Sequence, residues 1–530
     1  MEVGAESFAR CLPSLRRRIL RAAFVALDTE FTGLHSTYLQ NNEPSLFDSP
    51  AERYAKARQS VQHFTLVQLG KCSSGSESDL PRYMVHSYNF FLFPSTLGIR
   101  DVEFTFSASS IHFLSHYGFD YNKCLKDGIP YMNEVQEEIL RQHLLAGTWK
   151  VCSYANRDVL KKAIDEVTSW ITAAKEGNTM ILQDLNGYHM LEVQMVLRQA
   201  LENVWTEPLG DKKVMVKKVS PEDRRLLENS PYDHCQEKLI LHSARGFTNL
   251  FQILVTAKKP LVGHNMLMDL MHLHDKFYRP LPESYEEFKR NIHNLFPVII
   301  DTKTVTKSMQ KKCLFPRVSN LLEVYAVLCS SSLDPKGPPY PLITLGSSCS
   351  TYAENKSPHE AGYDAFLCGS VLLMSAHLLL CRSTDDAVEA EPSFSQYLTV
   401  LDQHVNKVNF IRGGVSSINF SGQDTPCHHP PALIVHVRGW PELTERQIYQ
   451  EFKSHRFDVR RLSKNQFILL SNKFKHVRLV LGDYRHHPHL QVSVYRHWRH
   501  SPNVNCLLQI SGIVALWSVL AFVLGGARSC

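Results

Sequence analysis

The sequence predicts an α/β protein built around a mixed β-sheet, and two observations lead to this prediction. Phe24–Leu27 form a short apolar run typical of a buried strand, and the strand-like runs 61–72 and 82–94 follow it as a meander joined by a turn-rich segment. Apolar residues recur with helical spacing at 108–119 and 133–145. Strands interleaved with helices in this way favour helices packed on the faces of one sheet.

Composition places the chain among ordinary globular proteins. Its 530 residues suggest about three domains, and 44% apolar with 21% charged residues allows sizeable cores. The 13 cysteines include no C-x-x-C pair, which argues against a structural zinc site and a disulfide framework and fits a reducing cytosol. The net charge of +6 is uneven, because residues 431–504 hold 13 Lys or Arg against 5 Asp or Glu, an excess of eight that leaves −2 for the rest. Such a segment is usually a solvated surface, but it also suits contact with a phosphate backbone.

Changes in composition divide the chain into successive segments. We expect an α/β core in two parts, 1–146 and 260–412, which are separated by a charged helical insert at 147–259. A linker at 413–430, a small α+β domain at 431–500 and an apolar helix at 506–524 are expected to follow. The insert is expected either to flank a substrate cleft or to be purely structural. Ser220 followed by Pro221 is a helix start within it.

The small domain has the order strand, helix, strand, strand, helix, strand, which is the layout of an RNA recognition motif. RNA-binding versions of that motif present stacked aromatic residues on their central strands. In this chain the strand QFILL offers only Phe467, so weak base stacking is expected there. The basic excess of the domain favours contact with RNA phosphates instead.

The chain ends in a hydrophobic segment. Residues 506–524 run for 19 residues without a charge, which is long enough to cross a bilayer as a helix. Trp517 and the flanking Arg496, Arg499 and Arg528 favour a transmembrane helix over the alternative of a buried C-terminal helix. We therefore expect a tail-anchored protein whose bulk faces the cytosol.

Four acidic residues in three short patterns predict a site for two metal ions. FVALDTEFTGL contains Asp28 and Glu30, LVGHNMLMD contains Asp269, and HEAGYDA contains His359 and Asp364. Asp28 and Glu30 are two residues apart on a strand, so both carboxylates project from one face. Two carboxylates about 4 Å apart repel by roughly 4 kcal/mol at an effective dielectric of about 20, so four in one place require divalent cations, Mg²⁺ or Mn²⁺. Each pattern alone is weak evidence, whereas the set in this order is typical of a nuclease with two metal ions.

The third acidic ligand is expected on a helix. Asn265 is the predicted N-cap of a helix whose first turns contain Asp269, after a short strand at 260–263. Asp301, at the end of the strand in LFPVIIDTK, is the reserve candidate for the same role. Either carboxylate would complete the set begun on the first strand.

The fourth ligand and the histidine are expected at the start of another helix. Ser357 is the predicted N-cap, Pro358 the first helical residue, and Glu360 the partner that completes a capping box. His359 would then lie in the first turn and Asp364 about one and a half turns later, so that both face one cleft.

These patterns resemble the DEDD-type 3′ exonucleases of ribonuclease H-like fold, in the subclass that has a histidine five residues before the last aspartate. Within that group the sequence is similar to the poly(A)-specific ribonuclease family through FVALDTEFTGL, GHNMLMDLMH, FYRPLP, the FP…DTK strand and HEAGYDA. The resemblance covers nearly the whole chain, and the apolar tail is similar to the Trimmer-like branch. The insert departs from the family because it lacks the Arg-x-x-x-His signature of the related nucleic-acid-binding module.

The resemblance implies a metal-dependent 3′-to-5′ exoribonuclease that acts on single-stranded RNA 3′ ends and releases 5′-nucleotides. For the Trimmer-like branch it implies 3′ trimming of PIWI-interacting RNA precursors at the mitochondrial outer membrane rather than the endoplasmic reticulum. A PIWI-class protein or an adaptor that presents the RNA is an expected partner, and a homodimer is one assembly to test. A poly(A) deadenylase, an inactive tail-anchored RNA-binding scaffold and a DNA-directed exonuclease remain alternatives.

Each predicted site residue has an expected role. Asp28, Glu30, Asp269 and Asp364 are the metal ligands, and His359 is the general base, because the unperturbed pKa of histidine is roughly 6.5. Phe31, Thr32 and Gly33, with Leu34, are expected to hold the terminal base and sugar. Core packing is the alternative for Phe31 and Leu34.

Overall fold

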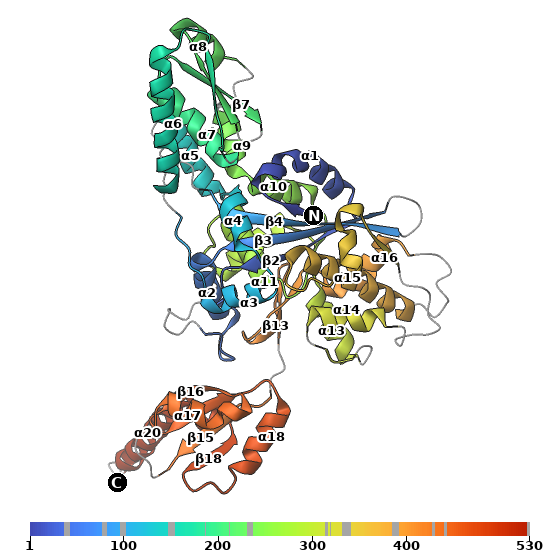
Figure 1. Cartoon of the computed structure of the whole chain (residues 1–530). Coiled ribbons are helices and arrows are strands. Elements are labelled where there is room, and N and C mark those ends of the chain that lie inside the picture. Colours follow the sequence, from blue (N-terminus) through green and yellow to red (C-terminus); the bar gives the residue numbers. More distant parts are fainter. Residues whose placement is uncertain are drawn as a thin grey trace. The chain divides into compact units, whose positions relative to one another are not determined.

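The computed structural model of the chain contains two compact units (Figure 1). The first comprises residues 1–43, 54–410 and 417–424, and the second comprises 44–53, 411–416 and 425–530. The structure describes residues 1–35, 43–76, 82–95, 102–146, 154–185, 187–210, 213–230, 237–312, 316–318, 320–330, 341–383, 392–426, 430–438 and 443–526.

A mixed sheet of eight strands forms the centre of the first unit. Its strands lie in the order β1 (Glu2–Val3), β4 (Arg82–Pro94), β3 (Leu66–Ser76), β2 (Phe24–Phe31), β9 (Leu261–Gly263) and β10 (Ile299–Asp301), and β5 (Ile129–Tyr131) and β11 (Leu342–Leu345) also pair with β4. β2, β3 and β4 are antiparallel neighbours, as expected for a meander, whereas β9 runs parallel to β2. The predicted mixed sheet is confirmed, and the first apolar run is one of its inner strands.

Helices cover both faces of this sheet (Figure 1). α15 (Ala361–Ser383) packs on the face from which Phe24 and Ala26 project, together with α13 (Thr302–Lys311), α14 (Leu321–Cys329) and α16 (Phe394–Leu401). On the opposite face lie α1 (Ala5–Arg21) and α10 (Phe247–Ala257), where the rings of Phe8 and Phe247 contact Phe90. The other helices of the core are α2 (Pro50–His63), α3 (Ala108–His116), α4 (Tyr121–Asp127), α5 (Glu134–Leu145), α9 (Glu237–Arg245), α11 (Leu267–Leu273) and α12 (Tyr285–Leu295).

One helix among the described residues, α15, is long and apolar enough to cross a membrane, and most of it is buried inside the protein. Its side chains contribute to the largest hydrophobic cluster around the sheet, which is the role of a core helix. The apolar stretch Cys506–Phe522 near the end of the chain is shorter than α15. The predicted tail anchor at 506–524 therefore stays a prediction.

The segment predicted as a helical insert contains a sheet of its own. α6 (Tyr154–Ala173), α7 (Gly187–Ala200) and α8 (Pro221–Glu228) alternate with β6 (Thr179–Leu182), β7 (Val204–Gly210) and β8 (Lys213–Lys218), which pair antiparallel in the order β6, β8, β7. The predicted helices are present, but the segment is not helical alone, because Val204, Val214 and Val216 bury one face of the sheet against α6 and α7. The predicted helix start is confirmed, since the Ser220 hydroxyl accepts a hydrogen bond from the amide of Asp223.

The predicted linker, 413–430, is also more ordered than expected. β13 (Val415–Asn419) and β14 (Thr425–Pro426) form a small sheet with β12 (Lys407–Asn409). The carboxylate of Asp424 accepts hydrogen bonds from Tyr285 and Lys289 of α12. A segment held by buried polar contacts of this kind is part of the fold rather than a plain connector.

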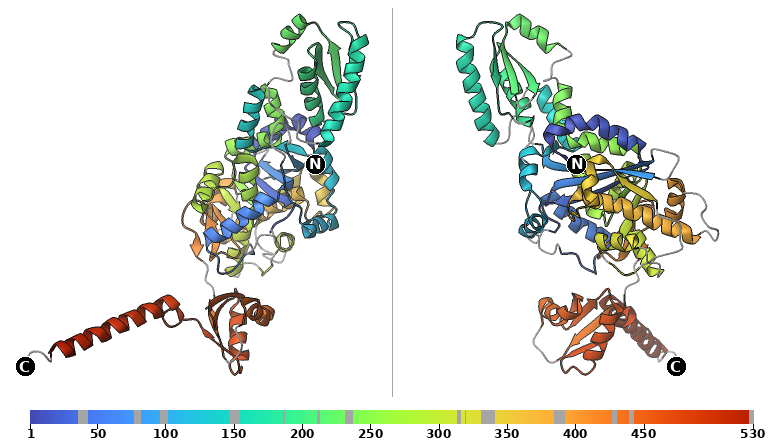
Figure 2. Two further views of the ribbon diagram at one scale, coloured as in Figure 1. Left: turned by 90° about the vertical axis from the view of Figure 1, so that its left-hand side faces the viewer. Right: turned by 45° about the vertical axis from the view of Figure 1, so that its right-hand side comes forward.

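The small C-terminal domain has the predicted order of elements (Figure 2). β15 (Leu433–Val437), α17 (Glu445–Phe452), β16 (Asp458–Ser463), β17 (Gln466–Leu470), α18 (Phe474–Asp483) and β18 (Leu490–Val494) form a sheet in the order β16, β17, β15, β18, and α19 (His497–His500) and α20 (Pro502–Gly526) follow. Phe467 is fully buried in the core of this domain. Stacking of RNA bases on Phe467 is therefore ruled out.

Candidate active site

β2 positions the first two acidic residues. Its first four residues are buried, which fixes the strand in the sheet, and Asp28 and Glu30 follow as half-buried residues. Asp28 is paired with Gly70 of β3, and Glu30 with Gln68. Since Gly70 and Gln68 touch the start of α15, both carboxylates project toward that helix as the two-residue spacing predicted.

The start of α15 differs from the prediction. The helix begins at Ala361, so the capping box at Ser357 was wrong. The amide of Ala361 donates to Gln68 Oε1 at 2.9 Å and that of Gly362 donates to Asn89 Oδ1 at 2.6 Å. These side chains of β3 and β4 satisfy amides that a helix leaves without intrahelical partners, which makes a local cap unnecessary.

Close contact between Gly70 and α15 gives a testable expectation. A Cβ at Gly70 would lie 1.8 Å from the carbonyl oxygen of Ala361, a backbone atom that cannot move alone. We expect Gly70→Ala to displace the helix start, to lower the free energy of unfolding by about 1–3 kcal/mol and to reduce RNA cleavage. Thermal melting and cleavage rates test this, with Gly482→Ala as the control, because nothing lies within 4 Å of a Cβ there. Equal melting and rates for wild type and Gly70→Ala would contradict it.

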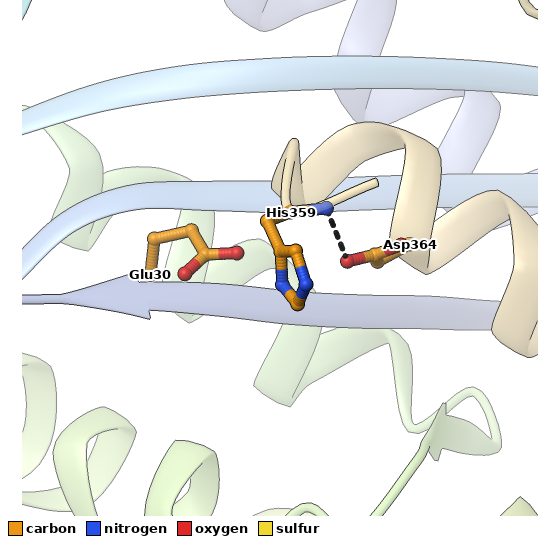
Figure 3. Close-up of side chains that lie close together, drawn as sticks. All are labelled: Glu30, His359 and Asp364. Atoms are coloured by element: carbon orange, nitrogen blue, oxygen red, sulfur yellow. Dashed lines mark hydrogen bonds between the residues drawn. The ribbon is translucent and has the colours of Figure 1, made fainter. Parts of the chain in front are cut away.

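His359 and Asp364 meet through the backbone. The amide of His359 donates to the Asp364 carboxylate at 3.1 Å, and His359 has a left-handed φ of 64°. This turn brings the imidazole beside Glu30, as Figure 3 shows. One ligand atom from each of Glu30, His359 and Asp364 lies within 4.8 Å of the others. Segments more than 300 residues apart in the sequence thus form one cluster.

Asp269 reaches the same site from α11. It is 8% exposed, and its carboxylate accepts a hydrogen bond from the Thr29 hydroxyl of β2. The predicted N-cap, Asn265, was wrong: Met266 precedes the helix, and Asn265 has a left-handed φ of 60°. The amide of Asn265 is held by the carboxylate of Asp301 at 2.8 Å. The helix therefore starts after a turn that Asp301 fixes.

Asp301, the reserve ligand, has a structural role. Its carboxylate is fully buried and accepts hydrogen bonds from the amides of Asn265, Lys303 and Asn409. It also caps α13 through the Lys303 amide. Because these donors occupy both oxygens, Asp269 is the better candidate for the third ligand.

Electrostatics shows that the four carboxylates share one environment. Burial, followed by the charges of Asp364, Asp269 and Glu30, raises the pKa of Asp28 well above its ordinary value. The pKa of Glu30 is raised in the same way, by burial and then by Asp364 and Asp269. Burial raises the pKa of Asp269 to about 6, although the Thr29 hydrogen bond opposes this.

Burial likewise raises the pKa of Asp364, to about 7, against the opposing hydrogen bond from the His359 amide. Among the described residues, no lysine or arginine forms an ion pair with Asp28, Glu30, Asp269 or Asp364. Buried carboxylates whose pKa is raised and that form no ion pair with a cationic side chain fit a site for divalent cations.

Two aromatic residues that the sequence analysis did not single out surround His359. The ring centroids of Phe113 and Tyr117 lie 4.6 Å and 4.4 Å from that of the imidazole. Both rings are more than 40% exposed, so they border the site rather than the core. Burial lowers the pKa of His359. Helical spacing located this segment, but no sequence signal tells an exposed aromatic residue from a buried one.

The residues expected to bind the terminal nucleotide divide into two groups. Phe31 is half-buried with its ring 4.3 Å from that of His272, and Leu34 is exposed, so both can reach a ligand. Thr32 is fully buried, and its hydroxyl accepts a hydrogen bond from the amide of Thr65. A Cβ at Gly33 would lie 2.4 Å from the ring of Phe64. These contacts favour a structural role for Thr32 and Gly33.

Comparison with known proteins agrees with this geometry. The model of the CAF1 family ribonucleases matches residues 3–372. The poly(A)-specific ribonuclease PNLDC1 of Mus musculus is 56% identical over 99% of this chain and 99% of its own length, and that of Homo sapiens is 56% identical over 96% and 98%. The pre-piRNA 3′-exonuclease trimmer of Bombyx mori is 27% identical over 98% and 96%. The chain belongs to the CAF1 ribonuclease family and is a 3′-to-5′ exoribonuclease.

Proposed function

We propose that the exoribonuclease activity depends on two divalent ions, Mg²⁺ or Mn²⁺, held by Asp28, Glu30, Asp269 and Asp364. The observation that carries this proposal is the gathering of the four carboxylates, in which burial and the charges of Asp364 and Asp269 raise the pKa of Asp28 and Glu30. Oxygen ligands are those that Mg²⁺ and Mn²⁺ prefer. Calorimetric titration of the chain with Mg²⁺ tests it, and loss of binding on replacing any one ligand is expected.

When bound, such ions activate a water molecule and stabilise the departing oxygen. The part played by His359 is to accept the proton of the attacking water as its oxygen bonds to the terminal phosphorus. The bond from phosphorus to the 3′ oxygen of the preceding nucleotide then breaks, and the product is a 5′-nucleotide. Because burial lowers its pKa, His359 is mainly neutral at neutral pH and able to take this proton.

Replacing His359 isolates this step. We expect His359→Asn to lower kcat by about 10²–10⁴-fold with little change in KM, because proton transfer belongs to the chemical step. The part of the acidic limb of the wild-type pH profile of kcat that is due to His359, whose pKa burial lowers, should disappear in the variant. His112→Asn on α3 is the matched control, since this exposed histidine is not a member of the cluster of Glu30, His359 and Asp364. An unchanged kcat in His359→Asn would remove the histidine from the mechanism.

For the substrate, we favour 3′ trimming of PIWI-interacting RNA precursors over deadenylation of mRNA. The likeness to the Bombyx mori trimmer over nearly the full length of both chains supports trimming. The name of the relatives at 56% identity, poly(A)-specific ribonuclease, supports deadenylation. Cleavage rates on one RNA that ends in a mixed sequence and on another that ends in an A tail distinguish trimming from deadenylation. Similar rates on both ends are expected, and a strong preference for the A tail would favour deadenylation.

We also propose that α20 anchors the protein in a membrane, with the mitochondrial outer membrane as the destination. Its large apolar side chains are exposed along the helix, including Leu507, Trp517 and Phe522, as expected for a surface that lipid covers. Imaging fusions with and without residues 506–530 tests the anchor and the membrane. A diffuse signal from the complete chain would exclude it. A PIWI-class protein or an adaptor remains the proposed partner, and co-purification of the anchored chain tests it.

A further inference from the structure

The C-terminal sheet has an outer face that α17 and α18 do not cover. In β15, Leu433, Val435 and Val437 are buried in the domain core between sheet and helices. Side chains alternate along a strand, so Ile434 and His436 point to the outer face. Ile434 is nevertheless 0% exposed. Another part of the chain must therefore cover this face.

The covering segment lies between β2 and α2 in the sequence. In β16, Val459 packs against the domain core, so Asp458 and Arg460 point outward. The amide of Leu46 donates to the Asp458 carboxylate at 2.7 Å. The Arg460 guanidinium lies 4.7 Å from the ring centroid of Phe47. Residues 44–53 belong to the same compact unit as the sheet, in agreement with these contacts.

Two further contacts involve the outer face of the sheet. Arg412 pairs with Asp458 at 3.5 Å and donates to the carbonyl oxygen of Pro44 at 2.9 Å, which holds the covering segment at its start. On the same outer face but on strand β15, the ring of His436 lies 5.9 Å from that of His500 in α19. Other parts of the chain thus contact the outer face at β16 and at β15.

The chemistry of the outer face suits a polypeptide better than RNA. RNA recognition motifs stack bases on aromatic residues of their two central strands. Here Ile434 of β15 and Ile468 and Leu470 of β17 occupy those outward positions, as the pairing register and the inward direction of Phe467 show. Aliphatic side chains offer no stacking surface.

We propose that this outer face is an intramolecular docking surface for residues 44–49, the strap, and that RNA bases do not bind there. The strap follows in sequence the turn at the end of β2, which contains Asp28 and Glu30, and it leads directly into α2. The C-terminal domain therefore holds a segment that lies between β2 and α2 in the sequence. Any contact of this domain with RNA is left to other surfaces.

Hydrogen exchange of the complete chain tests the docking. We expect slow exchange of the strap amides in wild type and exchange about tenfold faster in two variants. Phe47→Ala removes the ring that Arg460 contacts, and Asp458→Asn removes the negative charge that the Leu46 amide and Arg412 face. Arg461→Ala on the same strand is the control, because this arginine lies over the Phe467 ring and not over the strap. Asp458→Asn keeps the side-chain volume, so it stays informative if Phe47→Ala unfolds the domain. Strap amides that exchange freely in wild type, or equally fast in all variants, would overturn the proposal.

Photocrosslinking tests the exclusion of RNA. Single-stranded RNA containing 4-thiouridine is irradiated with the complete chain in the presence of a chelator, which prevents cleavage, and crosslinked residues are mapped by mass spectrometry. No crosslink to Ile434, Ile468 or Leu470 is expected, and crosslinks at these residues in wild type would refute the inference. Hydrogen exchange and crosslinking do not depend on catalysis. If the chain were inactive but its strap amides were protected, the result would contradict the proposed function and not the docking of the strap.

Discussion

Replacement of Asp28 by asparagine is expected to abolish RNA trimming and, at the same time, to raise the melting temperature of the metal-free chain. Asp28 is surrounded by Glu30, Asp269 and Asp364, whose charges raise its pKa. Removing one charge relieves repulsion in the metal-free site, so a rise of about 2–4 °C is expected. The same change removes a metal ligand, and a loss of about 10³-fold or more in kcat is expected.

Melting without metal and single-turnover cleavage of a 3′-labelled RNA measure the two effects. Glu354→Gln is the matched control, because this exposed carboxylate lies in the segment before α15 but outside the cluster, and it should change neither quantity. The paired result distinguishes a metal site from an ordinary structural network, in which Asp28→Asn would lower the melting temperature. Cleavage by Asp28→Asn at the wild-type rate would show that Asp28 holds no catalytic metal ion.

Removal of divalent cations is expected to stop trimming and to make stability depend on pH in a defined direction. Folding raises the pKa of Asp269 to about 6 and that of Asp364 to about 7, from the ordinary value of 3.8 for both. Between about pH 4 and pH 7 the folded metal-free chain therefore binds more protons than the unfolded chain. The free energy of unfolding should fall as the pH rises through this window.

Metal ions should reverse this trend, because they bind the carboxylates that protons leave. At about 100 times its dissociation constant, an ion adds roughly 2.7 kcal/mol to the free energy of unfolding. The stabilisation by Mg²⁺ should thus be larger at pH 8 than at pH 5, and chelator should abolish both cleavage and this stabilisation. Melting curves at the two pH values with Mg²⁺ or chelator test this. Equal stabilisation at both pH values would show that the ions bind elsewhere.

Local sequence signals predicted the strand that contains Asp28 and Glu30. Apolar Phe24–Leu27 could only be a buried strand, and the alternation after it placed Asp28 and Glu30 on one face. Regular alternation also predicted the order of elements in the C-terminal domain. These features depend on neighbours in sequence, so the pattern contains the information.

The capping predictions failed where partners come from a distance. Ser357 and Asn265 have the residue types of N-caps, yet the amides at the start of α15 bond to Gln68 and Asn89. Gly70 was overlooked as well, although glycine inside a strand pattern is a known signal of close backbone approach. Contacts between segments hundreds of residues apart decide these positions, and no local pattern records them.

By itself, the sequence determined which residues are available for chemistry: four carboxylates and a histidine in patterns of fixed spacing, and an aliphatic rather than aromatic choice on the C-terminal strands. Only the tertiary structure decided how they are used. In the folded chain, Asp269 lies in the carboxylate cluster, whereas Asp301 holds the Asn265 amide and caps a helix. His359 lies beside Glu30, and the strap contacts the outer face of the small sheet. The physical reason is that burial and charge coupling arise between distant segments, and they appear only when the chain has folded.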